Sequence, residues 1–166
     1  MTASSEAIQL ANLLASTNQR VVFAESCTGG LVAALLAQVP GVSEHFCGSA
    51  VTYREATKRL WLGVSAEDLA KFTAQSEQIA LQMATGVLVQ TPEADIALSI
   101  VGHLGPDAPV DIDGVVFVGI ATRESDQSTA GTVTRHTLDA SDREARQIEA
   151  ARLVLQHAIQ AISTLR

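Results

Sequence analysis

Residues 23–30 read FAESCTGG, and this stretch decides how the rest of the chain is interpreted. The preceding residues run into it with the β-branched and aromatic character of a buried strand, whereas residues 31–39 are rich in Ala and Leu and favour a helix. The pattern predicts a strand that delivers Ser26 and Cys27 to a helix N-terminus. Free N–H groups and the helix dipole suit an anion or a developing oxyanion at such a point.

The same turn has a simpler interpretation. Ser26 or Thr28 caps the helix, while Gly29 and Gly30 only permit a tight turn. The local sequence favours neither a catalytic turn nor a simple helix cap. If the turn is catalytic, Cys27 is the rival nucleophile. Side chains of neighbouring residues point different ways, so Cys27 ranks second and suits a small buried packing role.

Composition limits the class of protein. The chain has 166 residues, long enough for a full core and most simply one domain, residues 1–166. Its formal net charge of -7 gives no basic footprint for nucleic acid or an anionic membrane, and its apolar runs are too interrupted to span a bilayer. Cys27 and Cys47 lack metal-type or disulfide-framework spacing, and no signal peptide is evident. We expect a cytoplasmic protein with a small-molecule or protein partner.

Helical and strand patterns follow one another along the chain. Ser141 and Glu144 form a capping-box pattern for a last helix, and a short polar segment joins the last two strands, which predicts an antiparallel hairpin. The order of elements predicts an α/β fold: a three-layer α/β/α domain with a mixed, mostly parallel sheet. The expected helices cover residues 5–16, 31–38, 55–60, 66–72, 76–90 and 141–164, and the expected strands cover residues 20–24, 46–53, 94–102, 114–123 and 131–138.

A second motif, VTYREATK, occupies residues 51–58. Lys58 is one of only two lysines, and a lysine can act as the base of a serine only if its ammonium is desolvated. A pocket at the carboxyl ends of strands provides such a setting, and Ser26 and Tyr53 are both expected at such ends. The simpler interpretation, favoured without further information, is that Tyr53 covers the core and Lys58 lies on a solvated helix face.

Together these motifs carry a family resemblance. The segments ESCTGG (25–30), VTY (51–53) with Lys58, and LGV (62–64) resemble the CinA C-terminal domain family over nearly the whole chain. The resemblance implies an anticodon-binding-domain-like α/β/α fold and hydrolysis of the carboxamide of nicotinamide mononucleotide, with release of ammonia and without metal or cofactor. It implies Ser26 as nucleophile, Lys58 as its base and Tyr53 as an orienting or proton-relaying partner.

Substrate contacts are expected around this centre. Backbone donors from Thr28 to Gly30 are expected to stabilise an oxyanion. Arg143 and Arg146 lie three apart at the start of the last helix, where two cations suggest a compensating anion. A substrate phosphate is one candidate, and neighbouring carboxylates are the plainer one. The expected substrate-binding residues are Glu25, Cys27, Thr28, Gly29, Gly30, Gly102, His103, Arg143 and Arg146.

The segment VGHLGP, residues 101–106, departs from the family pattern Thr-Gly-x-Ala-Gly-Pro. Val101 removes a hydroxyl, the following loop is short and acidic, and Glu55 stands where relatives often have asparagine. His103 replaces a small apolar residue and either contacts the ligand or is a hydrogen-bonded structural histidine. Its neighbouring aspartates lack a recognised metal-ligand spacing, so no metal is expected.

These departures leave two alternatives to the hydrolysis of nicotinamide mononucleotide. One is a regulatory nucleotide-binding protein without the chemistry, and the other is an amidase for a different carboxamide. The apolar first helix and an exposed pair, Trp61 and Leu62, also predict a homo-oligomer.

Overall fold

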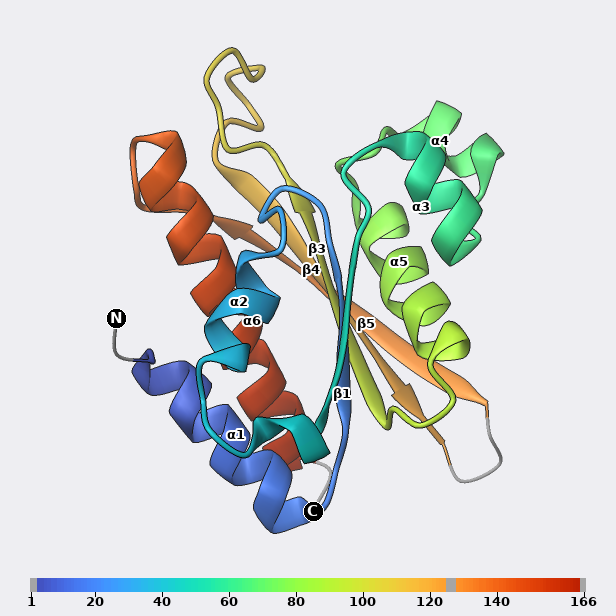
Figure 1. Ribbon diagram of the computed structural model, residues 1–166. Helices are drawn as coiled ribbons and strands as arrows, with labels where there is room; N and C mark the ends of the chain where they lie inside the picture. Colours follow the sequence, from blue (N-terminus) through green and yellow to red (C-terminus); the bar gives the residue numbers. More distant parts are fainter. Residues whose placement is uncertain (1–2, 125–127, 165–166) are drawn as a thin grey trace.

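The structure, a computed structural model, describes residues 3–124 and 128–164 and is built around a five-stranded sheet with helices on both faces (Figure 1). The predicted three-layer α/β/α fold is therefore confirmed. In chain order the elements are α1 (Ser5–Thr17), β1 (Val21–Glu25), α2 (Leu31–Ala37), the 3-10 turn η1 (Val42–Glu44), β2 (Phe46–Val51), α3 (Glu55–Leu62), α4 (Ala66–Phe72), α5 (Glu77–Gln90), β3 (Ile96–Gly102), β4 (Val115–Arg123), β5 (Thr129–Thr137) and α6 (Arg143–Thr164).

The strand order is β2-β1-β3-β4-β5. β1 pairs in parallel with β2 and β3, whereas β4 is antiparallel to both β3 and β5. Four strands therefore run in one direction and only β4 runs in the other, which matches a mixed, mostly parallel sheet. The predicted antiparallel hairpin of the last two strands is confirmed by the pairing of β4 with β5.

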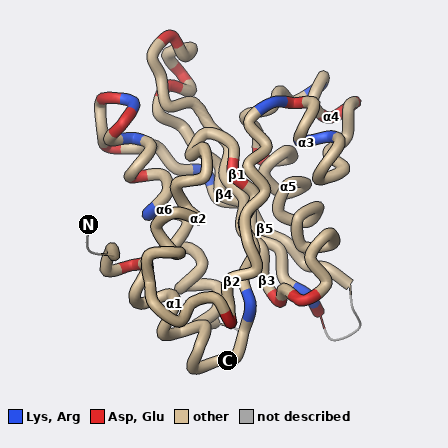
Figure 2. The backbone as a smooth tube through the Cα atoms, in the orientation of Figure 1, with Lys and Arg blue, Asp and Glu red and all other residues tan. Residues whose placement is uncertain are grey.

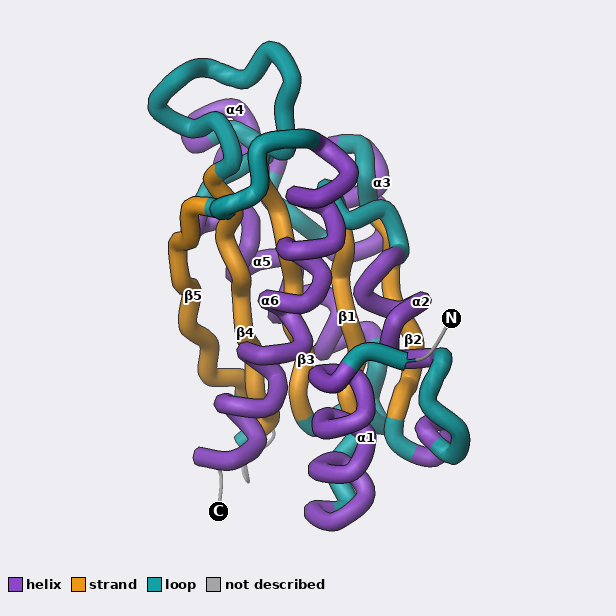
Figure 3. Tube along the Cα trace, turned by 90° about the vertical axis from the view of Figure 1, so that its left-hand side faces the viewer, coloured by secondary structure: helices purple, strands orange, loops and turns teal. Residues whose placement is uncertain are grey.

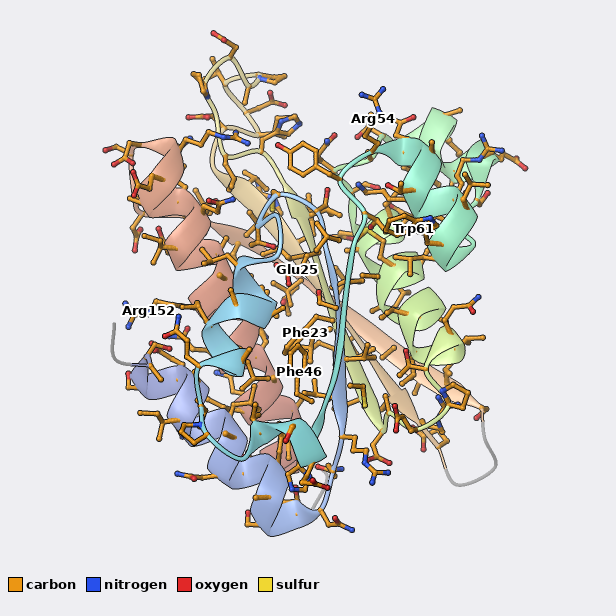
Figure 4. All side chains as sticks on the ribbon, in the orientation of Figure 1. Phe23, Glu25, Phe46, Arg54, Trp61 and Arg152 are labelled. Carbon is orange, nitrogen blue, oxygen red and sulfur yellow. The ribbon has the colours of Figure 1, made fainter. Side chains whose placement is uncertain are left out.

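The two faces of the sheet are covered by different helices. α1, α2 and α6 lie on one face, and α3, α4 and α5 lie on the other (Figure 3). The ion pair between Arg152 Nη2 of α6 and Glu6 Oε1 of α1, at 2.7 Å, ties two helices of the first layer together (Figure 4). β3 is buried along almost its whole length, as its continuous apolar sequence predicts, while the edge strand β5 is largely exposed.

Alternation along β1 positions the site. Phe23 packs into the core beneath α1 and α6, whereas Val22 and Ala24 pack into the core beneath α5. Because successive side chains of a strand point to opposite faces, Glu25 and Ser26 leave the end of β1 on opposite faces of the sheet. The carboxyl ends of β1, β2 and β3 meet at one edge, and the segments that follow them form the candidate site.

Two local predictions were wrong. α6 begins at Arg143, and its cap is Asp142, whose Oδ1 accepts a hydrogen bond from the N–H of Ala145 at 3.0 Å. Aspartate caps a helix as well as serine does, and its charge also favours the N-terminal end of the dipole. Leu62 is 5% exposed and packs against the α5 side of the core, so it is not part of an exposed apolar pair. The exposed large apolar residues of α3 are Leu60 and Trp61.

Charged residues gather mainly at the ends of the strands and helices rather than over the sheet (Figure 2). Among the described residues, the helices are all too short or too polar to cross a membrane.

Candidate active site

A small cavity of about 190 Å³ lies where the segments after β1, β2 and β3 meet. Ser26, Cys27 and Tyr53 line one side, residues 102–108 line another, and Gln75 and Arg143 complete the wall. The structure thus brings six of the predicted site residues to one cavity, namely Ser26, Cys27, Tyr53, Gly102, His103 and Arg143. Lys58 is not on the cavity wall, but its Nζ contacts Ser26 Oγ.

Lys58 is the centre of this arrangement. Its side chain is 1% exposed, and Nζ lies 2.8 Å from Ser26 Oγ, 2.6 Å from the carbonyl oxygen of Thr52 and 3.5 Å from the carbonyl oxygen of Tyr53. The N–H of Thr52 donates to the carbonyl of Glu25 at 2.8 Å, which fixes the Thr52 peptide against the end of β1. The interpretation of Lys58 as a solvated surface residue is therefore wrong.

Burial has a direct chemical effect on this lysine. It lowers the pKa of Lys58 from 10.5 to about 8, because the charged ammonium is removed from water. Carbonyl oxygens only accept hydrogen bonds, so in the neutral amine the two N–H groups can point at Thr52 and Tyr53. The lone pair then faces the hydroxyl of Ser26, which is the geometry of a general base.

Tyr53 contributes its ring to the cavity but not to this pair. The side chain is 57% exposed, and Oη accepts a hydrogen bond from Arg143 Nη2 at 3.0 Å. Within the described residues, Oη forms no hydrogen bond with Ser26 or Lys58. Arg143 also donates to the carbonyl of Gly105 at 2.5 Å, so its guanidinium joins α6 to both walls of the cavity.

The side chain of Glu25 accepts hydrogen bonds from the N-terminus of α2, so the chain itself supplies the anion at this end of the helix. The residue, labelled in Figure 4, is fully buried. Its five hydrogen bonds come from Thr28 Oγ1, the N–H groups of Gly30, Val32 and Ala33, and Ser49 Oγ, at 2.7–3.0 Å. The dipole of this helix is therefore compensated by an internal anion.

This arrangement corrects the predicted substrate contacts of the glycine turn. The Gly30 N–H is held by Glu25 and the Gly29 N–H by the carbonyl of Ser26 at 3.1 Å, so neither amide is free for an oxyanion. Gly29 and Gly30 adopt φ values of 62° and 102°, which L side chains rarely adopt, and this conformation allows the turn to fold around the carboxylate. Glu25, Thr28, Gly29 and Gly30 shape the turn instead of lining the cavity.

Two backbone amides beside Ser26 remain available. The N–H groups of Cys27 and Thr28 find no acceptor in the part of the chain that the structure describes. From the other side, Gln147 Nε2 of α6 donates to the carbonyls of Cys27 and Thr28, at 3.4 and 3.0 Å. The Cys27 side chain is 6% exposed and packs in the core beneath α6, and burial raises the pKa of its thiol to about 12. Such a thiol is a poor nucleophile.

The segment after β3 closes the cavity. Gly102 lies on its wall, and a Cβ at this position would lie 2.4 Å from the carbonyl oxygen of Val115, so the close pairing of β3 with β4 requires glycine. His103 lies beside it, with its peptide N–H bonded to the Val115 carbonyl at 3.0 Å. Arg146 is held away from the cavity by Asp113, to which it donates two hydrogen bonds at 2.7 and 2.9 Å.

No cluster of three or more metal-ligating side chains occurs in residues 3–124 and 128–164. Sequence reasoning missed Gln75, Gln147 and the carbonyl of Thr52. Backbone carbonyls leave no side-chain signature, and the two glutamines stand on segments whose approach to the cavity only the fold determines.

Comparison with known proteins agrees with this architecture. The family model of the CinA C-terminal domain matches residues 3–162. A CinA-like protein of Syntrophomonas wolfei is 40% identical over 117 residues, which are 68% of this chain and 27% of the relative. A CinA-like protein of Gloeothece citriformis is 44% identical over 105 residues, which are 62% of this chain and 25% of that relative. The chain thus spans about a quarter of the length of these curated relatives.

Solved structures extend the similarity to the whole fold. The competence damage-inducible protein A of Klebsiella pneumoniae has a TM-score of 0.88 and 29% identity, with 97% of both chains covered. A CinA superfamily protein from Klebsiella pneumoniae 700603 has a TM-score of 0.87 and 30% identity, with 96% of both chains covered. Since the family model covers nearly the entire chain, the protein belongs to the CinA C-terminal domain family.

Proposed function

We propose that this protein is an amidohydrolase that converts the carboxamide of nicotinamide mononucleotide, or of a related pyridine nucleotide, into a carboxylate. The observation that carries the proposal is the buried contact between Lys58 Nζ and Ser26 Oγ at 2.8 Å, with carbonyl acceptors around the rest of the amine. A desolvated lysine next to a serine is a known means of activating the hydroxyl.

The reaction follows from these groups. Ser26 Oγ attacks the carboxamide carbon while its proton passes to Lys58 Nζ, and the carbonyl oxygen becomes an oxyanion. The free N–H group of Cys27, which lies on the cavity wall, is the candidate to stabilise this charge. The C–N bond then breaks as Lys58 returns the proton to the leaving nitrogen, which releases ammonia and leaves an ester on Ser26.

A water molecule completes the cycle. Lys58 takes a proton from the water as its oxygen attacks the ester carbon, and the ester bond to Ser26 Oγ breaks. The proton returns to Ser26, so the enzyme is regenerated and the product is a carboxylic acid, ionised at neutral pH. Every proton transfer uses one amine, which is why its pKa near neutrality suits both directions of transfer.

The direct test is ammonia release from nicotinamide mononucleotide, nicotinamide riboside and nicotinamide. We expect Ser26→Ala and Lys58→Met each to reduce turnover by about 10³-fold or more, and the double variant to lose little more, because the two residues act as a unit. Cys27→Ser is the matched control at the neighbouring thiol and should stay within a few-fold of the parent. A Cys27→Ser protein without activity beside an active Ser26→Ala protein would reverse the assignment.

A nucleotide-binding protein without hydrolysis is the second candidate, and Val101 is the observation that favours it. Alternation and the parallel pairing of β1 with β3 place Val101 beside Ser26 on the α5 face, where it is 1% exposed and offers no hydroxyl. If nucleotides bind but no carboxamide yields ammonia, even with Val101→Thr, this second function is the correct one. Activity of the parent protein would decide for the hydrolase.

A further inference from the structure

The reactive cavity is too small for a whole nucleotide. Its volume of about 190 Å³ falls below the roughly 300–1,000 Å³ of ordinary ligand pockets, so a nucleotide with its carboxamide at Ser26 must extend beyond it. Two larger clefts adjoin the cavity. The α6 cleft is formed by residues 104–108, Val110, Asp113, 141–143 and Arg146, and the α3 cleft by residues 53–56, Arg59 and 74–75.

The α6 cleft is poorly suited to a phosphate. Three carboxylates, those of Asp107, Asp113 and Asp142, stand on its wall against the two guanidinium groups of Arg143 and Arg146. Both guanidinium groups are already used. Arg146 donates two hydrogen bonds to Asp113, and Arg143 donates to the Gly105 carbonyl and the Tyr53 phenol. A phosphate here would have to break these contacts and approach a net negative wall.

The α3 cleft has the opposite charge. Arg54 and Arg59 stand on its wall against the single carboxylate of Glu55, and neither guanidinium forms an ion pair within the described residues. Arg54 lies at the junction of β2 and α3, at the same end of the sheet as the reactive cavity (Figure 4). Tyr53 and Gln75 line both the cleft and the cavity, so the two spaces are adjacent.

We propose that the α3 cleft is the phosphate-binding site of this protein and that Arg54 and Arg59 hold the phosphomonoester of a nucleotide whose carboxamide lies at Ser26. The inference rests on the proposed function for the identity of the carboxamide end. The proposed phosphate site therefore differs from the start of α6, which the sequence suggested. The exposed ring of Tyr53 separates the two subsites and offers an apolar face to the ribose between them.

Glu55 is expected to weaken phosphate binding at this site. It precedes Arg59 by one helical turn and is the only carboxylate on the wall of the cleft. A carboxylate beside a bound phosphate opposes it, so Glu55 weakens binding of the phosphorylated ligand while leaving the unphosphorylated nucleoside unaffected. Substitutions of Arg54 and Glu55 therefore have opposite expected signs, which a merely structural role would not produce.

The test compares two ligands that differ only in the phosphate. Calorimetry on the Ser26→Ala protein, in which chemistry is off, gives Kd for nicotinamide mononucleotide and nicotinamide riboside. Arg54→Gln with Arg59→Gln should weaken nucleotide binding about tenfold or more, the scale of a charge-assisted hydrogen bond, and change riboside binding less than twofold. Glu55→Gln should tighten nucleotide binding only. Arg20→Gln, at the opposite end of β1, is the control.

The outcomes separate this inference from the proposed function. Ammonia release by the parent protein decides the hydrolase assignment, whereas the ratio of the two Kd values decides the phosphate site. If the protein is inactive but still prefers the nucleotide through Arg54 and Arg59, the phosphate site is supported and the hydrolase assignment is wrong. A ratio unchanged in the Arg54→Gln, Arg59→Gln protein but lost in Arg143→Gln would overturn the site, as would failure of the nucleotide to bind at millimolar concentration.

Discussion

Arg143 Nη2 and Tyr53 Oη are joined by a hydrogen bond of 3.0 Å that spans 90 residues of sequence. The contact links the first turn of α6 to the segment after β2, and both residues line the same cavity as Ser26. It also assigns the phenol a partner other than the Ser26 and Lys58 pair, which bears on the proton-relay role that the family resemblance implies for Tyr53.

Tyr53→Phe is expected to retain turnover within about tenfold, because the phenol bonds to Arg143 and not to Ser26 or Lys58. A residue that relays a proton in the transition state would instead contribute roughly 10²- to 10⁴-fold. The change removes only the hydrogen bond to Arg143 and should appear mainly as a higher KM. Steady-state ammonia release at several substrate concentrations separates the two parameters. A fall in kcat of more than 10²-fold, with KM unchanged, would restore the relay role.

The reaction should depend on pH through Lys58. The base must be neutral to accept the proton of Ser26, and its pKa is about 8, so kcat/KM should rise with pH and level off above that value. Cys27→Ser should leave the profile in place, because the pKa of the Cys27 thiol is raised to about 12. A profile that is flat from pH 6 to 9 would exclude Lys58 as the base.

The same lysine should make folding pH-dependent. Its pKa is 10.5 in the unfolded chain and about 8 in the folded protein, so the unfolded chain binds more protons between these values and stability rises with pH. The linkage predicts that Lys58 adds about 2 kcal/mol to the free energy of unfolding between pH 7 and 9.5. Urea unfolding at both pH values should show this gain in the parent and in Lys71→Met, but not in Lys58→Met.

Glu25→Gln should destabilise the protein severely. The amide group of glutamine places N–H donors against the N–H and hydroxyl donors that now converge on the carboxylate, and each buried group left without a partner costs about 1–3 kcal/mol. We expect a loss of at least about 3 kcal/mol in the free energy of unfolding measured with urea. Glu55→Gln, at an exposed carboxylate, should change it by less than about 0.5 kcal/mol.

A pair of histidines should add a second pH dependence. His157 Nε2 of α6 lies 2.8 Å from His136 Nε2 of β5, and burial, together with the neighbouring His136, lowers the pKa of His157 below 6.5. The unfolded chain therefore takes up a proton that the folded protein resists, and stability falls as the pH drops below 6.5. Urea unfolding at pH 7.5 and 5.5 should show a smaller loss for His157→Gln and for His136→Gln. An unchanged loss in both variants would contradict this assignment.

The fold was predictable because its strands and helices have strong periodic or apolar patterns. β1 and β3 are continuous apolar runs, and their burial between two helical layers is what such runs predict. The start of α6 was not predictable, since Ser141 and Asp142 are equally good caps. Only the hydrogen bond from the N–H of Ala145 to Asp142 distinguishes them. Leu62 was misplaced because an eight-residue helix has too few turns for sequence to define its buried face.

The site was predictable where the chemistry is local or carried by the family motif. Ser26 and Lys58 are 32 residues apart, yet each follows a strand whose carboxyl end faces the same edge. The partners of Arg143 and Arg146 were not predictable, because Tyr53, Gly105 and Asp113 reach them from distant segments. The sequence also places Glu25 next to a helix start without revealing that the carboxylate turns back to fill it.

Consecutive residues at the end of β1 therefore have separate tasks on opposite sides of the sheet. Glu25 holds the turn together on the α2 face, while Ser26 meets Lys58 on the α3 face. Selection can act on each face alone. If the proposed hydrolysis is correct, Ser26 or Lys58 can change without loss of the fold, whereas the architecture still needs the carboxylate of Glu25. Members that retain the glutamate but lack the serine or the lysine should therefore fold and not hydrolyse the carboxamide, and their sequences alone should identify them.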